Sequence, residues 1–311
     1  MKSRTRLGVS LALALSALVP AVASGQDYPS KTITIYTAAA EGNADVTARL
    51  IATHADLGQP VVVVNQPSVL SAQQVAQADP DGYSLLVLGK SFYLAPIFQA
   101  DTPYDPIAQF APISKITSTP NIMVVHPDLP DTVEGVIAKA KAEPGAFNYA
   151  TGASGGTAHL AAALLLDLTG IEMERVIYRG GGPSMVGVMS NESQLSFGTP
   201  AQVGPLVEAG NLKAIAVTSR NPSSVAPDLP TVAETVPGFQ MTSIQGFWTT
   251  AGTPQPIIDK LNKEVERILN LPEVKDILQK IGADADHSMP QDFAAEMKED
   301  IETTKRLMAG N

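Results

Sequence analysis

The sequence contains no cysteine, and histidine occurs at only four of its 311 positions. Without cysteine there can be no disulfides, thiolate metal sites or cysteine nucleophiles. The four histidines, His54, His126, His159 and His287, do not have the mutual spacing of a metal site. We therefore predict no metal and no cofactor. With 44% apolar residues, the chain has enough material to be stabilised by burial alone.

Basic clusters are missing as well, and 21 Lys and Arg residues stand against 31 Asp and Glu residues. This acidic balance argues against binding to nucleic acid or to an anionic membrane surface. Neither a Walker A loop nor a complete G-x-G-x-x-G pattern occurs, so nucleotide binding has no support. A small free ligand is the expected partner.

Long apolar runs are limited to the N-terminus. Three basic residues, at positions 2, 4 and 6, precede an apolar run over 7–19, and small residues follow up to Gly25. This layout is typical of a secretory signal peptide, and the run is too short for a membrane anchor. We predict a leader over 1–25, cleaved after Ala23 or Gly25, and a periplasmic mature protein. Loss of the three basic residues changes the formal net charge from −10 to −13.

Downstream, short β-branched runs alternate with helical patterns, which is typical of layered α/β folds with mostly parallel strands. Two such series are separated near Asn121, and a Pro-rich crossover over 221–237 precedes a last strand and three helices. We predict two lobes, 26–121 with 240–311 and 122–239, with a ligand cleft between them. The predicted strands are 32–37, 61–64, 85–88, 122–125, 147–150, 175–178, 194–197, 214–218 and 244–249. The predicted helices are 43–55, 132–142, three beginning near His159, Pro183 and Ala201, and then 255–269, 272–281 and 290–308.

The densest polar constellation is the Gly-rich segment 151–159, between a predicted strand and an apolar helix. Its glycines let backbone amides approach a ligand, and the helix start adds partial positive charge, so the segment suits an anion. Ser154, Gly155, Thr157 and His159 are its candidate binding residues. A tight turn that merely caps the helix is an equally open interpretation.

The same segment fits the G-x-S-x-G pattern of a serine esterase, with Ser154 as the nucleophile. A triad would also need an acid and a suitably placed histidine. His159 is too close in sequence, and His287 lies in a polar loop before the last helix. We therefore expect a binding protein and not an enzyme, with the esterase as the alternative.

Two further turns of the second lobe follow strands. Tyr178 and Arg179 precede three glycines and a proline, so Arg179 is either a fixed cation for the ligand or a solvated surface residue. Thr199 follows the next strand, where it either donates into the cleft or caps a helix.

In the first lobe the equivalent turn contains only small and polar residues before a predicted helix. Its candidate binding residues are Ala38, Ala39, Ala40, Gly42, Asn43 and Asp45. Glu41 within this turn opposes an anion unless it faces solvent. Lys90 and Ser91 follow another strand, where Lys90 offers positive charge and Phe92 and Tyr93 offer an apolar wall. We expect at least one of the two aromatics to belong to the core instead.

Several segments, taken in this order, resemble the extracytoplasmic binding proteins of tripartite tricarboxylate transporters, the Bug or TctC family. They span nearly the whole mature chain. The matching segments are 28–31 (YPSK), 57–63 (LGQPVVV), 80–83 (PDGY), 103–106 (PYDP), 110–113 (FAPI), 125–127 (VHP), 148–150 (NYA), 212–218 (LKAIAVT) and 229–234 (LPTVAE).

The resemblance implies a Venus-flytrap fold that holds a ligand carboxylate between the turns of two lobes and delivers it to the membrane permease subunits of the transporter. Carried over by position, the contacts fall at 37–45 and 154–159 and at Tyr178, Arg179 and Thr199. It further implies lobe closure about hinges near Asn121 and Phe239. The protein is expected to act as a monomer. Its alternative role is that of a ligand-sensing partner of a membrane signalling protein.

The sequence departs from the family pattern at the expected pocket. Family members usually have Pro- and Gly-rich first loops and a later glycine cluster, where this chain has 38–42 and Ser68-Val69-Leu70. Side chains there suit an acid with an apolar or aromatic body, packed against Val69, Leu70, Phe92 and Tyr93, better than they suit citrate.

Overall fold

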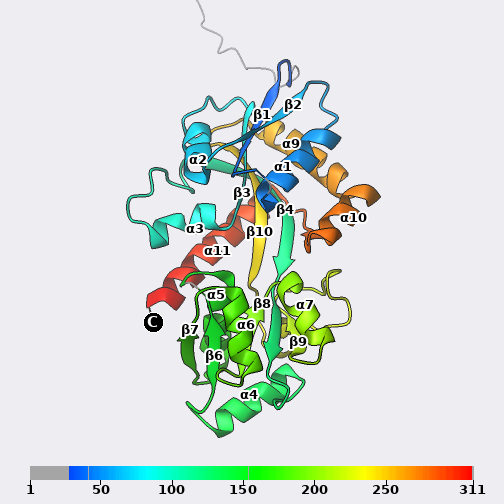
Figure 1. The fold of residues 1–311 in the computed structure, drawn as a ribbon. Helices are drawn as coiled ribbons and strands as arrows, with labels where there is room; N and C mark the ends of the chain where they lie inside the picture. Colours follow the sequence, from blue (N-terminus) through cyan, green and yellow to red (C-terminus); the bar gives the residue numbers. More distant parts are fainter. Residues whose placement is uncertain (1–27, 41, 153, 310–311) are drawn as a thin grey trace, which may run out of the picture.

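The computed structural model describes residues 28–40, 42–152 and 154–309. The predicted signal peptide, Glu41 and Ala153 lie outside these residues. The described chain forms two α/β bodies joined by extended strands (Figure 1). We call the body built on the six-stranded sheet lobe 1 and the body built on the five-stranded sheet lobe 2.

Lobe 1 has strands from both ends of the chain. They are β1 (Ile33–Thr37), β2 (Val61–Asn65), β3 (Ser84–Gly89), β4 (Phe110–Pro120), β10 (Thr242–Thr250) and β11 (Asp284–Ala285). Their order in the sheet is β11-β4-β10-β3-β1-β2. Strands β1, β2 and β3 are parallel, whereas β10 runs antiparallel to both β3 and β4.

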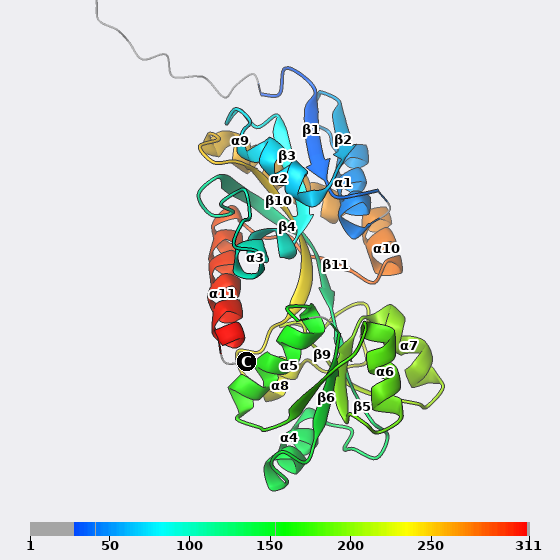
Figure 2. The same ribbon diagram turned by 60° about the vertical axis from the view of Figure 1, so that its left-hand side comes forward.

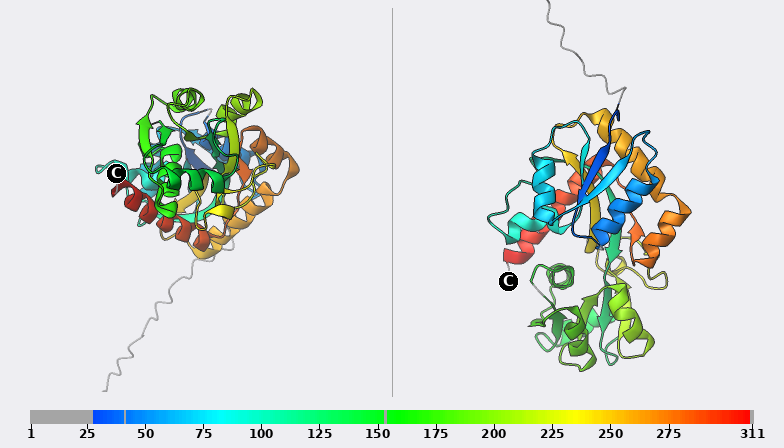
Figure 3. Two further views of the ribbon diagram at one scale, coloured as in Figure 1. Left: turned by 90° about the horizontal axis from the view of Figure 1, so that it is seen from below. Right: turned by 45° about the horizontal axis from the view of Figure 1, so that its top comes forward.

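Helices cover both faces of this sheet because successive strand residues point to opposite sides. Ile33, Ile35 and Phe247 pack against α1 (Asn43–His54), α9 (Gln255–Leu269) and α10 (Pro272–Lys280). Trp248 packs on the other face, against α2 (Ser68–Ala76), α3 (Ser91–Phe98) and α11 (Pro290–Ala309). Figure 3 shows these two groups of helices on either side of the sheet.

Lobe 2 is built on β5 (Ile122–Val125), β6 (Asn148–Thr151), β7 (Glu174–Ile177), β8 (Leu195–Gly198) and β9 (Lys213–Val217), in the order β7-β6-β8-β5-β9. One face packs on α4 (Val133–Ala142), α5 (Thr157–Thr169) and α8 (Val232–Thr235). The other face packs on α6 (Gly181–Met189) and α7 (Pro200–Glu208).

The two-lobed α/β arrangement is confirmed, but the sheets are mixed and not mostly parallel. Strands β10, β11 and β5 run against their neighbours, because the chain passes between lobes on long strands and not only through helical crossovers. The lobe boundaries near 121 and 240 stay a prediction. The end of α11 complicates them, because Leu307 packs in the core of lobe 2.

The last helix runs along lobe 1, and its C-terminal end reaches lobe 2 (Figure 2). Phe293 and Met297 belong to the lobe 1 core, whereas Leu307 belongs to the lobe 2 core and Met308 packs against it. Arg306 also pairs with Asp167 of α5 at 3.1 Å. Within the described residues, no helix has the length and apolar character needed to cross a membrane.

Candidate functional site

The turn between β1 and α1 lies at the carboxyl end of β1, on the edge of lobe 1. Ala39, Ala40, Gly42 and Asn43 are exposed there. Asp45 is buried instead, and its carboxylate accepts a hydrogen bond from Asn65 at 2.8 Å and pairs with Arg49 at 2.9 Å. Asn65 also donates to the carbonyl of Ala38. The backbone of this turn therefore faces solvent, while Asp45 helps to fix its shape.

Lys90 joins β3 to α3, and its ammonium is held within lobe 1. It forms an ion pair with Asp300 of α11 at 2.9 Å, and the Tyr93 hydroxyl donates to the same carboxylate at 2.5 Å. Ser91 is exposed. Both Phe92 and Tyr93 are fully buried in the lobe 1 core, so the predicted apolar wall of Phe92 and Tyr93 is wrong.

The Gly-rich turn of lobe 2 is fixed by an arginine that sequence reasoning missed. Arg175 lies on the edge strand β7, and its guanidinium donates to Thr151 Oγ1 at 2.8 Å and to Ser154 Oγ at 3.1 Å. It also donates to the carbonyl of Gly152 at 3.3 Å. The planar fork of Arg can hold three acceptors in one orientation. The turn thus receives both its shape and a positive charge from Arg175.

His159 lies in the first turn of α5, next to this loop. The backbone N–H of Gly155 donates to its Nδ1 at 3.1 Å, so the proton of the neutral ring is on Nε2. Among the described residues that buried Nε2 has no hydrogen-bond partner. Burial, and secondarily the charge of Arg175, lower the pKa of His159 to about 4. The ring is therefore neutral near pH 7, and its acceptor nitrogen is already used. This arrangement does not suit a general base for Ser154.

Of the other predicted residues of lobe 2, two are exposed and one has a side chain that already contacts another residue. Arg179 and Thr199 are exposed at the carboxyl ends of β7 and β8. Thr199 begins α7, and its backbone N–H donates to Gln202. The Tyr178 hydroxyl lies 3.5 Å from Ser193 Oγ. Ser193 precedes β8, so this hydroxyl is at the opposite end of the strand from Thr199.

Two contacts bring the Gly-rich turn against lobe 1. Thr157 Oγ1 lies 3.1 Å from Ser243 Oγ on β10. The ring of Phe98, at the end of α3, lies against Gly155, where a Cβ would be 2.6 Å from its Cε1. The turn that was predicted to bind an anion therefore lies between the lobes and contacts lobe 1 directly through Gly155 and Thr157.

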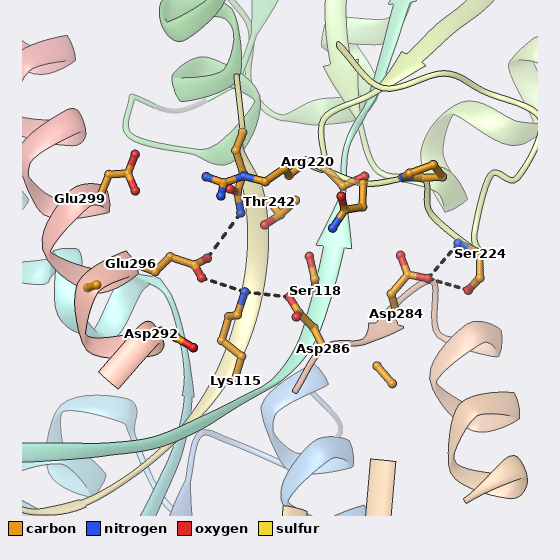
Figure 4. Close-up of a pocket in the computed structure, with 16 residues that line it drawn as sticks. Lys115, Ser118, Arg220, Ser224, Thr242, Asp284, Asp286, Asp292, Glu296 and Glu299 are labelled. Atoms are coloured by element: carbon orange, nitrogen blue, oxygen red, sulfur yellow. Dashed lines mark hydrogen bonds and ion pairs between the residues drawn. The ribbon is translucent and has the colours of Figure 1, made fainter. Parts of the chain in front are cut away.

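A cavity of about 650 Å³ lies between the lobes on the other side of β10. Thr242 lines it, whereas its neighbour Ser243 contacts Thr157, and adjacent strand residues point to opposite faces. Figure 4 shows its wall, formed by β4, β11, α11 and the segment after β9. Most of its charged residues are acidic: Asp284, Asp286, Asp292, Glu296 and Glu299. Within the described residues, no group of three or more candidate ligands could hold a metal ion.

Lys115 is the buried cation of this cavity. It pairs with Glu296 at 2.8 Å and with Asp286 at 3.1 Å. Burial by itself would lower the pKa of Lys115, but the two carboxylates outweigh burial and raise the pKa. Across the cavity, Asp284 accepts a backbone hydrogen bond from Ser224 at 3.0 Å. These contacts occupy Lys115 and Asp284, whereas Arg220 of the segment after β9 also lines the cavity and adds a second positive charge.

Two α/β lobes joined by crossing strands, with a cavity between them, are the architecture of binding proteins that close around a ligand. The profile of the family described as "Tripartite tricarboxylate transporter family receptor" matches residues 47–310. The chain belongs to this family.

A relative from Agrobacterium vitis, described as a UPF0065 protein in the TAR-I ttuE-ttuC′ intergenic region, is 31% identical over 96% of this chain and 89% of its own length. Among solved structures, a TctC solute-binding protein from Polaromonas without ligand is 26% identical, with a TM-score of 0.81 over 91% of this chain and all of that one. The R. palustris protein Rpa4515, solved with adipate, is 28% identical, with a TM-score of 0.62 over 90% of this chain and 97% of that one.

Proposed function

We propose that this chain is a periplasmic receptor that captures a small organic carboxylate between its lobes. It would pass the acid to the permease subunits of a tripartite tricarboxylate transporter and act as a monomer released by cleavage of the leader at 1–25. The adipate bound to a family relative supports the carboxylate class. The closer match to the ligand-free structure supports an open arrangement of the lobes here.

The observation that carries this proposal is the Gly-rich turn of lobe 2, which Arg175 holds at the gap between the lobes. Backbone amides at a helix start, with a guanidinium beside them, favour a carboxylate. Direct contacts are proposed for the backbone of 38–40, Gly42 and Asn43, for Ser154 to Thr157, and for Arg179 and Thr199. Asp45 and Lys90 already have partners within lobe 1, so we propose that they support the site. The Tyr178 hydroxyl points away from the site toward Ser193, and no direct contact is proposed for it.

Thermal unfolding with a panel of mono-, di- and tricarboxylates tests the proposal. A ligand that binds only the folded chain adds about 2.7 kcal/mol at a concentration of one hundred times Kd. The methyl esters of the same acids are the matched control, because they keep the carbon skeleton and lose the charge. The acids should raise Tm and the esters should not. If no acid in the panel raised Tm, or if acids and esters raised it equally, the proposed function would be contradicted.

Small-angle scattering measures the accompanying motion. Receptors of this class close about their hinges when the ligand bridges both lobes. The radius of gyration should therefore fall at a saturating concentration of an acid that raised Tm. An unchanged radius would mean that the acid binds without bringing the lobes together, which contradicts capture between them. Native mass spectrometry of the purified protein can identify a retained acid by its mass.

A further inference from the structure

Phe98 stands apart from the other aromatic residues of α3. Phe92 and Tyr93 are 3% and 1% exposed in the lobe 1 core, whereas Phe98 is 42% exposed at the end of the helix. Single exposed apolar side chains are common on protein surfaces, so Phe98 is informative because of what its ring contacts. The core of lobe 1 does not account for its position.

The ring lies against the Gly-rich turn of the other lobe. A Cβ on Gly155 would be 2.6, 2.8 and 3.2 Å from the Cε1, Cζ and Cδ1 atoms of Phe98, and the φ of Gly155 is +77°. Both the close approach and the backbone angle require glycine there. The contact therefore places an aromatic face beside the main chain of the residue that follows Ser154.

We infer that Phe98 determines which carboxylates the site prefers, by providing the apolar surface against which the carbons next to the bound carboxylate pack. This inference rests on the proposed function. An anion held at the turn by Arg175 and the first amides of α5 has Phe98 as its apolar neighbour from lobe 1. Acids with a methylene chain or an aromatic ring would gain from this contact, whereas short hydroxylated acids would not.

A homologous series of acids separates this role from that of a simple spacer between lobes. Calorimetric titration with malonate, succinate, glutarate, adipate and suberate gives the change in Kd per added methylene. Each methylene that packs on the ring should strengthen binding about fourfold. In Phe98→Ala that increment should fall below about twofold, with malonate affinity changed least.

Ile107→Ala is the matched control. Ile107 is 44% exposed in lobe 1. It precedes β4, whose first residue, Phe110, pairs with Thr250. This end of β4 is the one remote from lobe 2. Its variant should keep the wild-type increment. Phe98→Leu keeps apolar volume and should give an intermediate increment, which also covers the case in which the alanine variant folds poorly.

The outcomes distinguish the two claims. If the wild type binds acids but its increment per methylene is absent, or is the same in Phe98→Ala, the role of Phe98 is overturned and the receptor function stands. If Phe98→Ala weakens all acids by one common factor, Phe98 is only a spacer between lobes, and the inference fails. If the wild type binds none of these acids or the rest of the carboxylate panel, the receptor function and the inference fail together.

Discussion

Phe293 and Leu307 lie on the same helix, α11, and their side chains pack in the cores of different lobes. Phe293 contacts the lobe 1 cluster around Trp248, with ring centroids 5.2 Å apart. Leu307 is 6% exposed in the lobe 2 cluster. The helix therefore links the lobes independently of the strands that cross between them, and any closing motion has to bend it or pivot about its end.

Leu307→Ala tests this link. Truncation of a buried leucine typically lowers the free energy of unfolding by about 2–5 kcal/mol. We expect a loss of this order in denaturant unfolding. Leu168→Ala on α5, where the side chain is 40% exposed, is the control and should cost less than about 1 kcal/mol. Equal losses in the two variants would show that α11 is not anchored in lobe 2.

Arg175 and Arg179 make a second comparison, on ligand binding. Arg175→Lys keeps the charge but cannot reproduce the three hydrogen bonds to Thr151, Ser154 and Gly152. We expect it to weaken acid binding at least about tenfold, since each lost bond to a charged group is worth about 1.5–3 kcal/mol. Titration calorimetry on both variants measures this change.

Arg179→Lys is the comparison for this experiment. Arg179 is proposed to contact the ligand directly, but it is exposed and the variant keeps its positive charge, so we expect a smaller loss of affinity than in Arg175→Lys. A larger loss in Arg179→Lys than in Arg175→Lys would show that the ligand depends on the exposed arginine and not on the loop that Arg175 fixes.

These two arginines also show which parts of the site could not be predicted from the sequence. The Gly-rich turn could be found because glycine, hydroxyl and strand-to-helix patterns are local. Arg175 could not, because it reaches the turn from a neighbouring strand, through the pairing of Thr151 with Ile177. Arg179 was chosen because it follows a strand, yet at that edge of the sheet its side chain is exposed.

The fold was largely predictable because the patterns that indicate helices and strands are also local in the sequence. The predicted helix over 255–269 coincides with α9, and the lobe 2 strands are each within one residue of prediction. β4 was missed, because Pro112, Lys115 and Thr117 break the apolar pattern of a strand. That strand is irregular where it pairs with β10 and crosses between lobes, so tertiary pairing and not local propensity determines it. Phe92 and Tyr93 were divided between pocket wall and core, and both are core, because burial depends on packing that a linear pattern does not contain.

The low pKa of His159 predicts a pH dependence of stability. The unfolded chain binds a proton on this residue below about pH 6.5, whereas the folded chain binds it only near pH 4. The free energy of unfolding should therefore fall as pH is lowered through this window, by up to about 3 kcal/mol. Denaturant unfolding at pH 7.0 and 4.5 measures the change.

His159→Asn is the matched variant, because the amide oxygen can still accept the Gly155 N–H but does not titrate. Carboxylates elsewhere titrate in both proteins, so the informative quantity is the difference between wild type and variant. The wild type should lose more stability than the variant between pH 7.0 and 4.5. A difference that is the same at both pH values would mean that the imidazole is not held neutral by burial.

Lys115 gives the last prediction, on the cavity between the lobes. Its side chain is 11% exposed between Glu296 and Asp286, whereas Lys31 pairs with Asp81 at 3.1 Å with its side chain 62% exposed. Lys115→Met leaves two carboxylates without their cation and should lower the free energy of unfolding by about 3–5 kcal/mol. Lys31→Met removes a pair of similar length and should cost less than about 1 kcal/mol, because water screens exposed charges.

Adding Glu296→Gln to Lys115→Met should recover part of the loss, since the remaining charge is then smaller. If the double variant were less stable by the full sum of the two single changes, the ion pair would not be the source of the stability.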